Sequence, residues 1–167
     1  MDTIPDTHPE RPADRWFAAY AADHQHPLNQ QLHVICVPAT VWSIVALLFA
    51  VPTPLGWSDA LPSQGVVAAL LTVGALGFWL WLSMPLGLGI LLLAVPGFWL
   101  AQQILRAFGT SGLLVTATTV FVIAWIGQFI GHHVEGRRPS FFTDLVYLLI
   151  GPPWVLAKAY RKLGLRY

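Results

Sequence analysis

Hydrophobic positions run through this chain in long unbroken blocks. Between Asp59 and Arg106 lie 46 consecutive residues without a charged side chain. At about 1.5 Å per helical residue, this block is roughly twice the length needed to cross a hydrocarbon core of about 30 Å, so we expect two membrane-spanning helices in it. Proline lacks an amide proton and disfavours a helical conformation in the preceding residue, which predicts a break at Ser83-Met84-Pro85.

Two further apolar blocks complete the pattern, one closed by Pro52 and the other followed by the charged Glu135. The sequence therefore predicts an all-α integral membrane protein whose four transmembrane helices cover about 34–51, 65–83, 86–105 and 112–131. We expect residues 1–15 to form a disordered tail and residues 16–167 to form a single membrane domain.

The segments at the two ends of this domain differ from the predicted spans. An amphipathic segment precedes the first span, and residues 141–163 contain an apolar stretch interrupted by Gly151-Pro152-Pro153. That stretch is too short to cross a bilayer, which favours a re-entrant or interfacial segment. An even number of spans places both termini on one face. The excess of Lys and Arg there indicates the cytoplasm, at the inner membrane of a bacterium or the endoplasmic reticulum of a eukaryote.

Composition agrees with a protein surrounded by membrane lipids. The chain is 56% hydrophobic and only 10% charged, far from the average of soluble domains. Its net charge of +1 comes with scattered Lys and Arg, so no basic patch predicts nucleic-acid binding. Because Cys36 is the single cysteine, no disulfide can form within the chain.

Five of the six histidines lie in two short polar segments, 20–33 and 128–135. The predicted topology brings both segments to the same membrane face. In the first segment, a bend at His26-Pro27, with Pro27 opening a new helix, would let His24 and His33 converge. A straight helix would point these two side chains apart, because nine residues make about half a turn beyond two full turns.

The second segment places three polar side chains on one helix face, Gln128, His132 and Glu135. Neutral imidazoles with a nearby carboxylate suit a mononuclear iron(II) or zinc site with an open position. Interhelical hydrogen bonds would explain the histidines at the span ends equally well. Alternatively, Glu135 forms a surface ion pair with Arg137 or Arg138. We expect two histidines to be bystanders, His133 on the side of the helix and His8 in the tail.

These two segments carry a resemblance to a known family. The matching residues are Tyr20, His24, Asn29 and His33 in the first segment, and Gln128-Phe-Ile-Gly131-His132, Glu135 and Pro139 in the second. With them the chain resembles the membrane family whose studied member is the yeast 2-hydroxy fatty acid dioxygenase of phytosphingosine breakdown. The resemblance implies an iron(II)-dependent dioxygenase that uses O₂ to shorten 2-hydroxy fatty acids by one carbon. It also implies catalytic and metal-binding candidates, namely His24, His33, His132 and Glu135.

For such an enzyme we expect the head group of the substrate at the cytoplasmic edge and its tail in an apolar chamber between helices. The residues expected to contact the substrate are Tyr20, Asn29, Gln128, Arg137 and Arg138. A small transporter is disfavoured, because no predicted span carries an Asp, Glu, Lys or Arg at its centre. A structural or assembly membrane protein without catalysis stays open. A di-iron lipid hydroxylase is disfavoured, because such enzymes need more histidines than this chain has.

Overall fold

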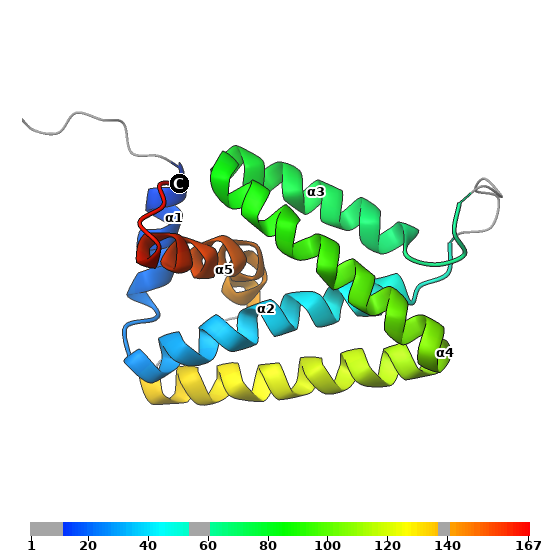
Figure 1. Ribbon diagram of the computed structural model, residues 1–167. Helices are drawn as coiled ribbons and strands as arrows, with labels where there is room; N and C mark the ends of the chain where they lie inside the picture. Colours follow the sequence, from blue (N-terminus) through cyan, green and yellow to red (C-terminus); the bar gives the residue numbers. More distant parts are fainter. Residues whose placement is uncertain (1–11, 54–60, 137–140) are drawn as a thin grey trace, which may run out of the picture.

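The computed structural model describes residues 12–53, 61–136 and 141–167, which are mostly helical (Figure 1). The helices are α1 (Pro12–Ala22), α2 (Pro27–Phe49), α3 (Val66–Leu82), α4 (Met84–Glu135) and α5 (Phe141–Lys162). The predicted all-α class is confirmed. Of the tail predicted to be disordered, residues 1–11 lie outside the described part, whereas residues 12–15 open α1 and are therefore helical.

Helix α4 consists of two arms joined at Gly109. This glycine has φ 69° and ψ −175°, a conformation with positive φ that side chains with a Cβ rarely adopt. The first arm covers 84–108 and the second arm covers 110–135, close to the predicted spans 86–105 and 112–131. The second arm runs back alongside α2 (Figure 1).

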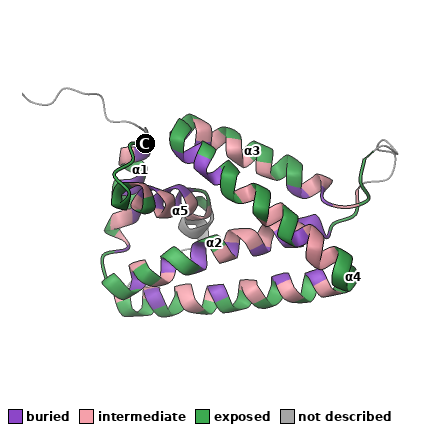
Figure 2. Ribbon diagram, viewed as in Figure 1, coloured by how far each residue is buried: buried purple, intermediate pink, exposed green. Residues whose placement is uncertain are grey.

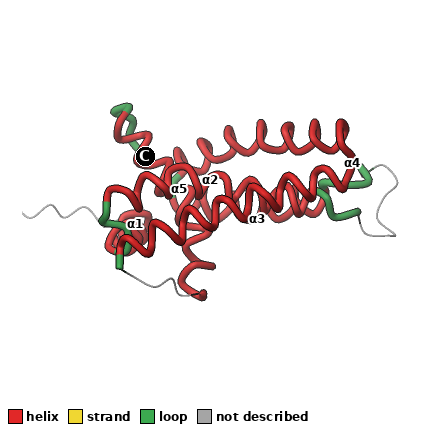
Figure 3. The backbone as a smooth tube through the Cα atoms, turned by 90° about the horizontal axis from the view of Figure 1, so that it is seen from below, coloured by secondary structure: helices red, strands yellow, loops and turns green. Residues whose placement is uncertain are grey.

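Helices α3 and α4 meet at the predicted break. Helix α3 ends at Leu82 and α4 begins at Met84, and the two helices pack closely where Gly87 faces Leu80. A Cβ added to Gly87 would lie 2.9 Å from the Leu80 Cα. The loops and turns lie at the two ends of the bundle, with α1 and α5 at one of them (Figure 3).

The exterior of the bundle is strongly apolar. Exposed and half-buried positions run along α3 and both arms of α4 (Figure 2), with Leu92 and Val115 among the most exposed large side chains. Two helices, α2 and α4, are long and apolar enough to cross a membrane, with mean hydropathies of 2.2 and 2.0, and α3 is a shorter apolar helix. The crossing of a bilayer by four segments stays a prediction.

Helix α5 continues through Pro152 and Pro153, where the sequence predicted an interruption. A proline inside a helix leaves the carbonyl four residues earlier without its donor. For Pro153 this carbonyl belongs to Leu149, and the indole nitrogen of Trp79 donates to it at 2.7 Å. A side chain from α3 thus replaces one of the missing backbone donors, which sequence periodicity alone does not reveal.

Two glycines allow the second arm to approach α2. A Cβ on Gly127 would lie 2.6 Å from the Cys36 Sγ, and one on Gly131 would meet the Asn29 Oδ1 and lie 3.3 Å from the Asn29 Cα. Small residues spaced four apart are a common means of close helix packing in membranes. Here they bring the polar start of α2 against the polar end of α4.

Candidate metal centre

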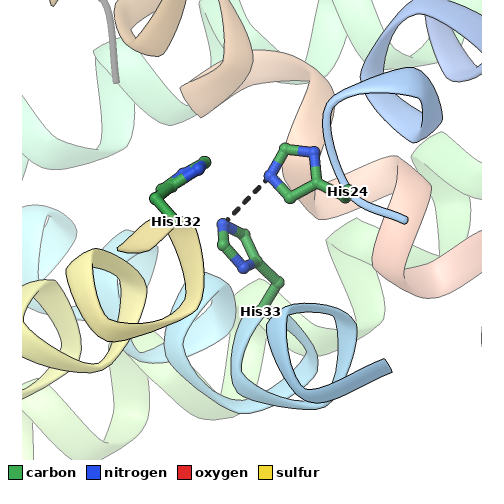
Figure 4. A group of neighbouring side chains, drawn as sticks. All are labelled: His24, His33 and His132. Atoms are coloured by element: carbon green, nitrogen blue, oxygen red, sulfur yellow. Dashed lines mark hydrogen bonds between the residues drawn. The ribbon is translucent and has the colours of Figure 1, made fainter. Parts of the chain in front are cut away.

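Three histidines from separate segments face a common space (Figure 4). His24 lies in the turn between α1 and α2, His33 in the second turn of α2, and His132 in the last turn of α4. Each offers one ring nitrogen, and these three nitrogens lie within 4.8 Å of one another. The side chains of His24 and His33 are only 1% exposed. The predicted convergence of the three histidines is confirmed.

The predicted bend produces this convergence. Helix α1 ends at Ala22, and α2 begins at Pro27. His26 caps the new helix, because its Nδ1 accepts a hydrogen bond from the Leu28 backbone N–H at 3.2 Å. A cap and a proline at the first helical position together fix the start of α2. The turn then carries His24 back over His33.

The protonation of the rings follows from their hydrogen bonds. The Nδ1 of His24 lies 2.7 Å from the Tyr20 carbonyl oxygen, and the Nδ1 of His33 lies 2.9 Å from the Asn29 carbonyl oxygen. A carbonyl oxygen only accepts, so each Nδ1 carries a proton and donates it. Burial lowers the pKa of His24 below its ordinary value, which favours the neutral ring.

In neutral rings protonated at Nδ1, the lone pairs lie on the Nε2 atoms. The Nε2 atoms of His24 and His33 are 3.1 Å apart. Two lone pairs at this distance repel each other unless a cation lies between them. Two imidazole nitrogens that bind one metal ion at about 2.1 Å, at nearly a right angle, are separated by about 3 Å. The donor set therefore fits a divalent ion, and the Nδ1 contacts match the usual second hydrogen bond of a metal-bound histidine.

The Glu135 carboxylate is engaged at the turn between α1 and α2. It accepts hydrogen bonds from the backbone N–H of Gln25 at 3.0 Å, the backbone N–H of His26 at 2.8 Å and the Asn29 Nδ2 at 3.0 Å. The group of converging nitrogens forms without it. A carboxylate is stabilised at the start of a helix by the unpaired N–H groups there. Glu135 thus fixes the turn that presents His24.

The alternative ion pairs of Glu135 with Arg137 or Arg138 lie outside the described residues, as do both arginines as substrate contacts. Asn29 was also expected to contact the substrate. Its side chain is fully buried and donates to Glu135, so it supports the turn between α1 and α2.

Aromatic rings pack against the His24 ring on the side of α1 and α5. The Tyr20 ring stacks on the His24 ring with centroids 4.1 Å apart and an interplanar angle of 3°. The ring centroids of Tyr147 and Trp154, both in α5, each lie 4.8 Å from the centroid of the Tyr20 ring. The Tyr147 hydroxyl also donates to the Asp23 carboxylate at 2.7 Å. These contacts restrict the orientation of the imidazole.

Two supporting residues were not foreseen from the sequence. The Gln30 Nε2 donates to the His24 carbonyl oxygen at 2.7 Å, and the Gln30 Oε1 accepts from the Lys158 Nζ at 2.7 Å. The Lys158 Nζ lies 3.9 Å from the centroid of the Trp154 ring. The helical spacing of Gln30 gives no signal of this role, because both partners reach it through the tertiary packing of the turn and α5.

A cavity of about 60 Å³ adjoins the histidines. Of the expected substrate contacts, Tyr20 and Gln128 line it, and the Gln128 Nε2 donates to the Thr40 Oγ1 at 2.8 Å. Trp125 was not foreseen here. It lines the cavity as well, and its buried Nε1 has no acceptor among the described residues. The other walls come from α2, the second arm and α5, through Val37, Phe129, Tyr147 and Leu148.

The fold and the site together define a class, an apolar all-helical protein with three converging histidines, two of them buried, next to a small cavity. Residues 11–163 match the family described as 2-hydroxy-palmitic acid dioxygenase Mpo1-like, and the chain belongs to this family. The resemblance read from the two polar segments is thereby confirmed.

One curated relative is the Saccharomyces cerevisiae protein named 2-hydroxy-palmitic acid dioxygenase MPO1. It is 29% identical to this chain over 149 residues, which are 87% of this chain and 78% of the yeast protein. No solved structure matches the chain.

Proposed function

We propose that this protein is an iron(II)-dependent dioxygenase that shortens 2-hydroxy fatty acids by one carbon. The observation that supports it best is the facing pair of Nε2 atoms, 3.1 Å apart in two buried histidines whose Nδ1 atoms are committed to carbonyl oxygens. His132 adds a third nitrogen to the pair. The family and the name of the yeast relative support the substrate class.

The overall reaction balances without a further reductant. One 2-hydroxypalmitic acid and one O₂ give one pentadecanoic acid, one CO₂ and one water. Bound iron(II) would supply the activation of O₂ and a Lewis acid for the substrate oxygens. The three histidines would hold the ion and leave positions for the substrate and O₂, as in other non-haem iron oxygenases.

The surrounding residues have separate tasks in this proposal. Tyr20 stacks on His24 and would keep its Nε2 directed at a bound ion. Glu135 acts as a positioning residue, because it accepts from the backbone N–H groups of Gln25 and His26 in the turn that carries His24. Gln128 lies at the cavity wall, where its amide suits the carboxylate or hydroxyl of a substrate. Arg137 or Arg138 would attract the carboxylate from the cytoplasmic side.

The proposal includes a membrane arrangement. Helices α2 and α3 and the two arms of α4 would cross the bilayer, with both termini in the cytoplasm and the histidines at the cytoplasmic edge. The basic residues Lys158, Arg161 and Lys162 of α5 agree with the positive-inside tendency, and Lys158 reaches the turn of His24 through Gln30. This membrane would be the inner membrane of a bacterium or the endoplasmic reticulum of a eukaryote.

The test is turnover by protein purified without oxygen and loaded with iron(II). With 2-hydroxypalmitate we expect one pentadecanoate and one CO₂ per O₂ consumed, and with palmitate no O₂ uptake above background. His133→Ala is the matched control for His132→Ala, since His133 lies on the neighbouring helix position and is exposed. Absence of O₂ uptake by folded, iron-loaded protein would refute the proposed reaction.

A further inference from the structure

The cavity beside the histidines is too small for a whole fatty acid. Its volume is about 60 Å³, whereas pockets that enclose a small organic ligand usually have roughly 300–1,000 Å³. The cavity therefore has room only for small groups. If the proposed function holds, it can receive the hydroxyl and carboxylate of the substrate, and the hydrocarbon tail must lie elsewhere.

Phe129 marks the place where the cavity reaches the outer surface. Its ring lines the cavity and is also 48% exposed among the apolar side chains of the second arm. Trp125 lies one turn earlier on the same helix, and Leu148 faces them from α5. The wall of the cavity is therefore also part of the apolar exterior at this edge.

Exposed apolar positions continue from this edge along one face of the second arm. Ile126 and Val122 precede Phe129 by three and seven residues, so the three share a helix face, and they are 54% and 47% exposed. A shallow surface hollow, lined by Leu114, Val115, Thr118 and Thr119, continues the same arm. We call Phe129, Ile126 and Val122 the tail stripe.

The length of this stripe matches a long acyl tail. Such a tail spans one leaflet of the hydrocarbon core, roughly 15 Å, which corresponds to about ten residues of helix. From Phe129 this distance reaches Thr119, at the shallow hollow. The tail would run from the cytoplasmic edge toward the middle of the bilayer, as the tails of neighbouring lipids do.

From the cavity volume and the exposure of its wall, we infer that the substrate tail leaves the cavity past Phe129 and lies along the tail stripe, between the second arm and lipid. The inference rests on the proposed function for the class of ligand. It makes the 2-hydroxy-carboxylate the part of the substrate that is recognised inside the protein. In this arrangement no closed pocket limits the length of the tail.

Photo-crosslinking tests the path directly. The probe is 2-hydroxypalmitic acid with a diazirine near the middle of its tail, added without oxygen to the full iron(II)-loaded protein in phosphatidylcholine nanodiscs. We expect adducts on Val122 and Ile126 that excess 2-hydroxypalmitic acid suppresses. Ile123 is comparably exposed but lies about 100° around the helix from Val122 and about 120° from Phe129, so it should carry fewer adducts than Val122.

A matched pair of variants tests the same path by kinetics. Phe129→Asn and Ile130→Asn place one amide at positions of similar exposure, 48% and 50%, so a general defect in the membrane would affect both alike. We expect KM for 2-hydroxypalmitate to rise about tenfold in Phe129→Asn only, which corresponds to about 1.4 kcal/mol. Wild-type kcat/KM should change gradually with tail length, without a sharp upper limit.

The outcomes separate this inference from the proposed function. Suppressible adducts on the tail stripe, without any turnover, would support the path and refute the reaction. Turnover with adducts on the interior face of α2, equal labelling of Ile123 and Val122, or no suppressible adduct would overturn the path. A fall of about a hundredfold in kcat/KM between neighbouring tail lengths would likewise overturn it.

Discussion

Helix α2 and the second arm of α4 form a pair whose two ends differ in polarity. At the end near the Gly109 bend, Ala46 and Phe49 of α2 pack in a cluster with Leu113 and Ala117 of the second arm. At the other end, polar side chains of α2 meet the end of the second arm through Asn29–Glu135 and Thr40–Gln128 hydrogen bonds. One pair of helices thus carries an apolar contact and a polar contact.

This difference indicates which positions tolerate substitution. Apolar burial is non-directional and depends mainly on area and volume, so similar residues can replace one another at the apolar end. A buried polar group that loses its partner costs its full desolvation penalty. The polar end therefore depends on particular atoms at particular distances, and its substitutions should alter function before they alter the fold.

The largest expected effect is the removal of a histidine at the polar end. His33→Ala and His132→Ala each remove a candidate ligand, so O₂ uptake with 2-hydroxypalmitate should fall by more than about a hundredfold, beyond the usual cost of a residue that only supports a ligand. His133→Ala should keep near wild-type uptake. If His133→Ala were as damaging as His132→Ala at normal expression, the assignment of the helix face would be wrong.

The next effect concerns the closeness of the two helices. Gly131→Ala forces a Cβ against the backbone and side chain of Asn29, and we expect the free energy of unfolding to fall by about 1–3 kcal/mol. Gly127→Ala meets only the end of the Cys36 side chain and should cost less. Gly74→Ala, with open space around it, is the control. Unfolding in detergent measures all three, and equal stability of Gly131→Ala and Gly74→Ala would contradict the close packing.

Substitution of Glu135 tests whether the turn between α1 and α2 positions the candidate ligands at the polar end. Glu135→Ala removes the acceptor of two backbone N–H groups and of the Asn29 Nδ2, so the Kd for iron(II) should rise about 10–100-fold. Equilibrium titration without oxygen measures it, with Glu135→Gln as the milder variant. Complete loss of iron binding, equal to that of His33→Ala, would instead make Glu135 a ligand.

The smallest effect belongs to the apolar end. Ile104 packs on the cluster of Ala46 and Phe49, and Ile104→Val removes one methyl group at a cost of about 0.5–1.5 kcal/mol in unfolding free energy. Iron affinity should stay within error of the wild type. A changed iron affinity here would show that the two ends are coupled and would contradict their separate roles.

Part of this site could be predicted from the sequence because its causes are local. Pro27 after His26 indicates the bend, and the spacing of Gln128 and His132 indicates a shared helix face. The Ser83 break and the two polar segments follow from proline chemistry and from the alternation of apolar blocks. Each of these inferences needs only a few neighbouring residues.

The rest depends on tertiary contacts between distant elements. The continuation of α5 through its prolines relies on an indole from α3, and the Gln30–Lys158 contact joins residues 128 positions apart. The hydrogen bonds of Glu135 could not be predicted either, because helical spacing gives its face but not the backbone N–H groups that meet it there.

The central claim is that three histidines bind one metal ion, and X-ray absorption at the iron edge of the anaerobically loaded protein tests it most directly. We predict one iron per chain with three imidazole nitrogens at about 2.1 Å, and the same spectrum for Glu135→Gln. An iron environment with fewer than three imidazoles, or folded protein that binds no iron, would contradict the claim.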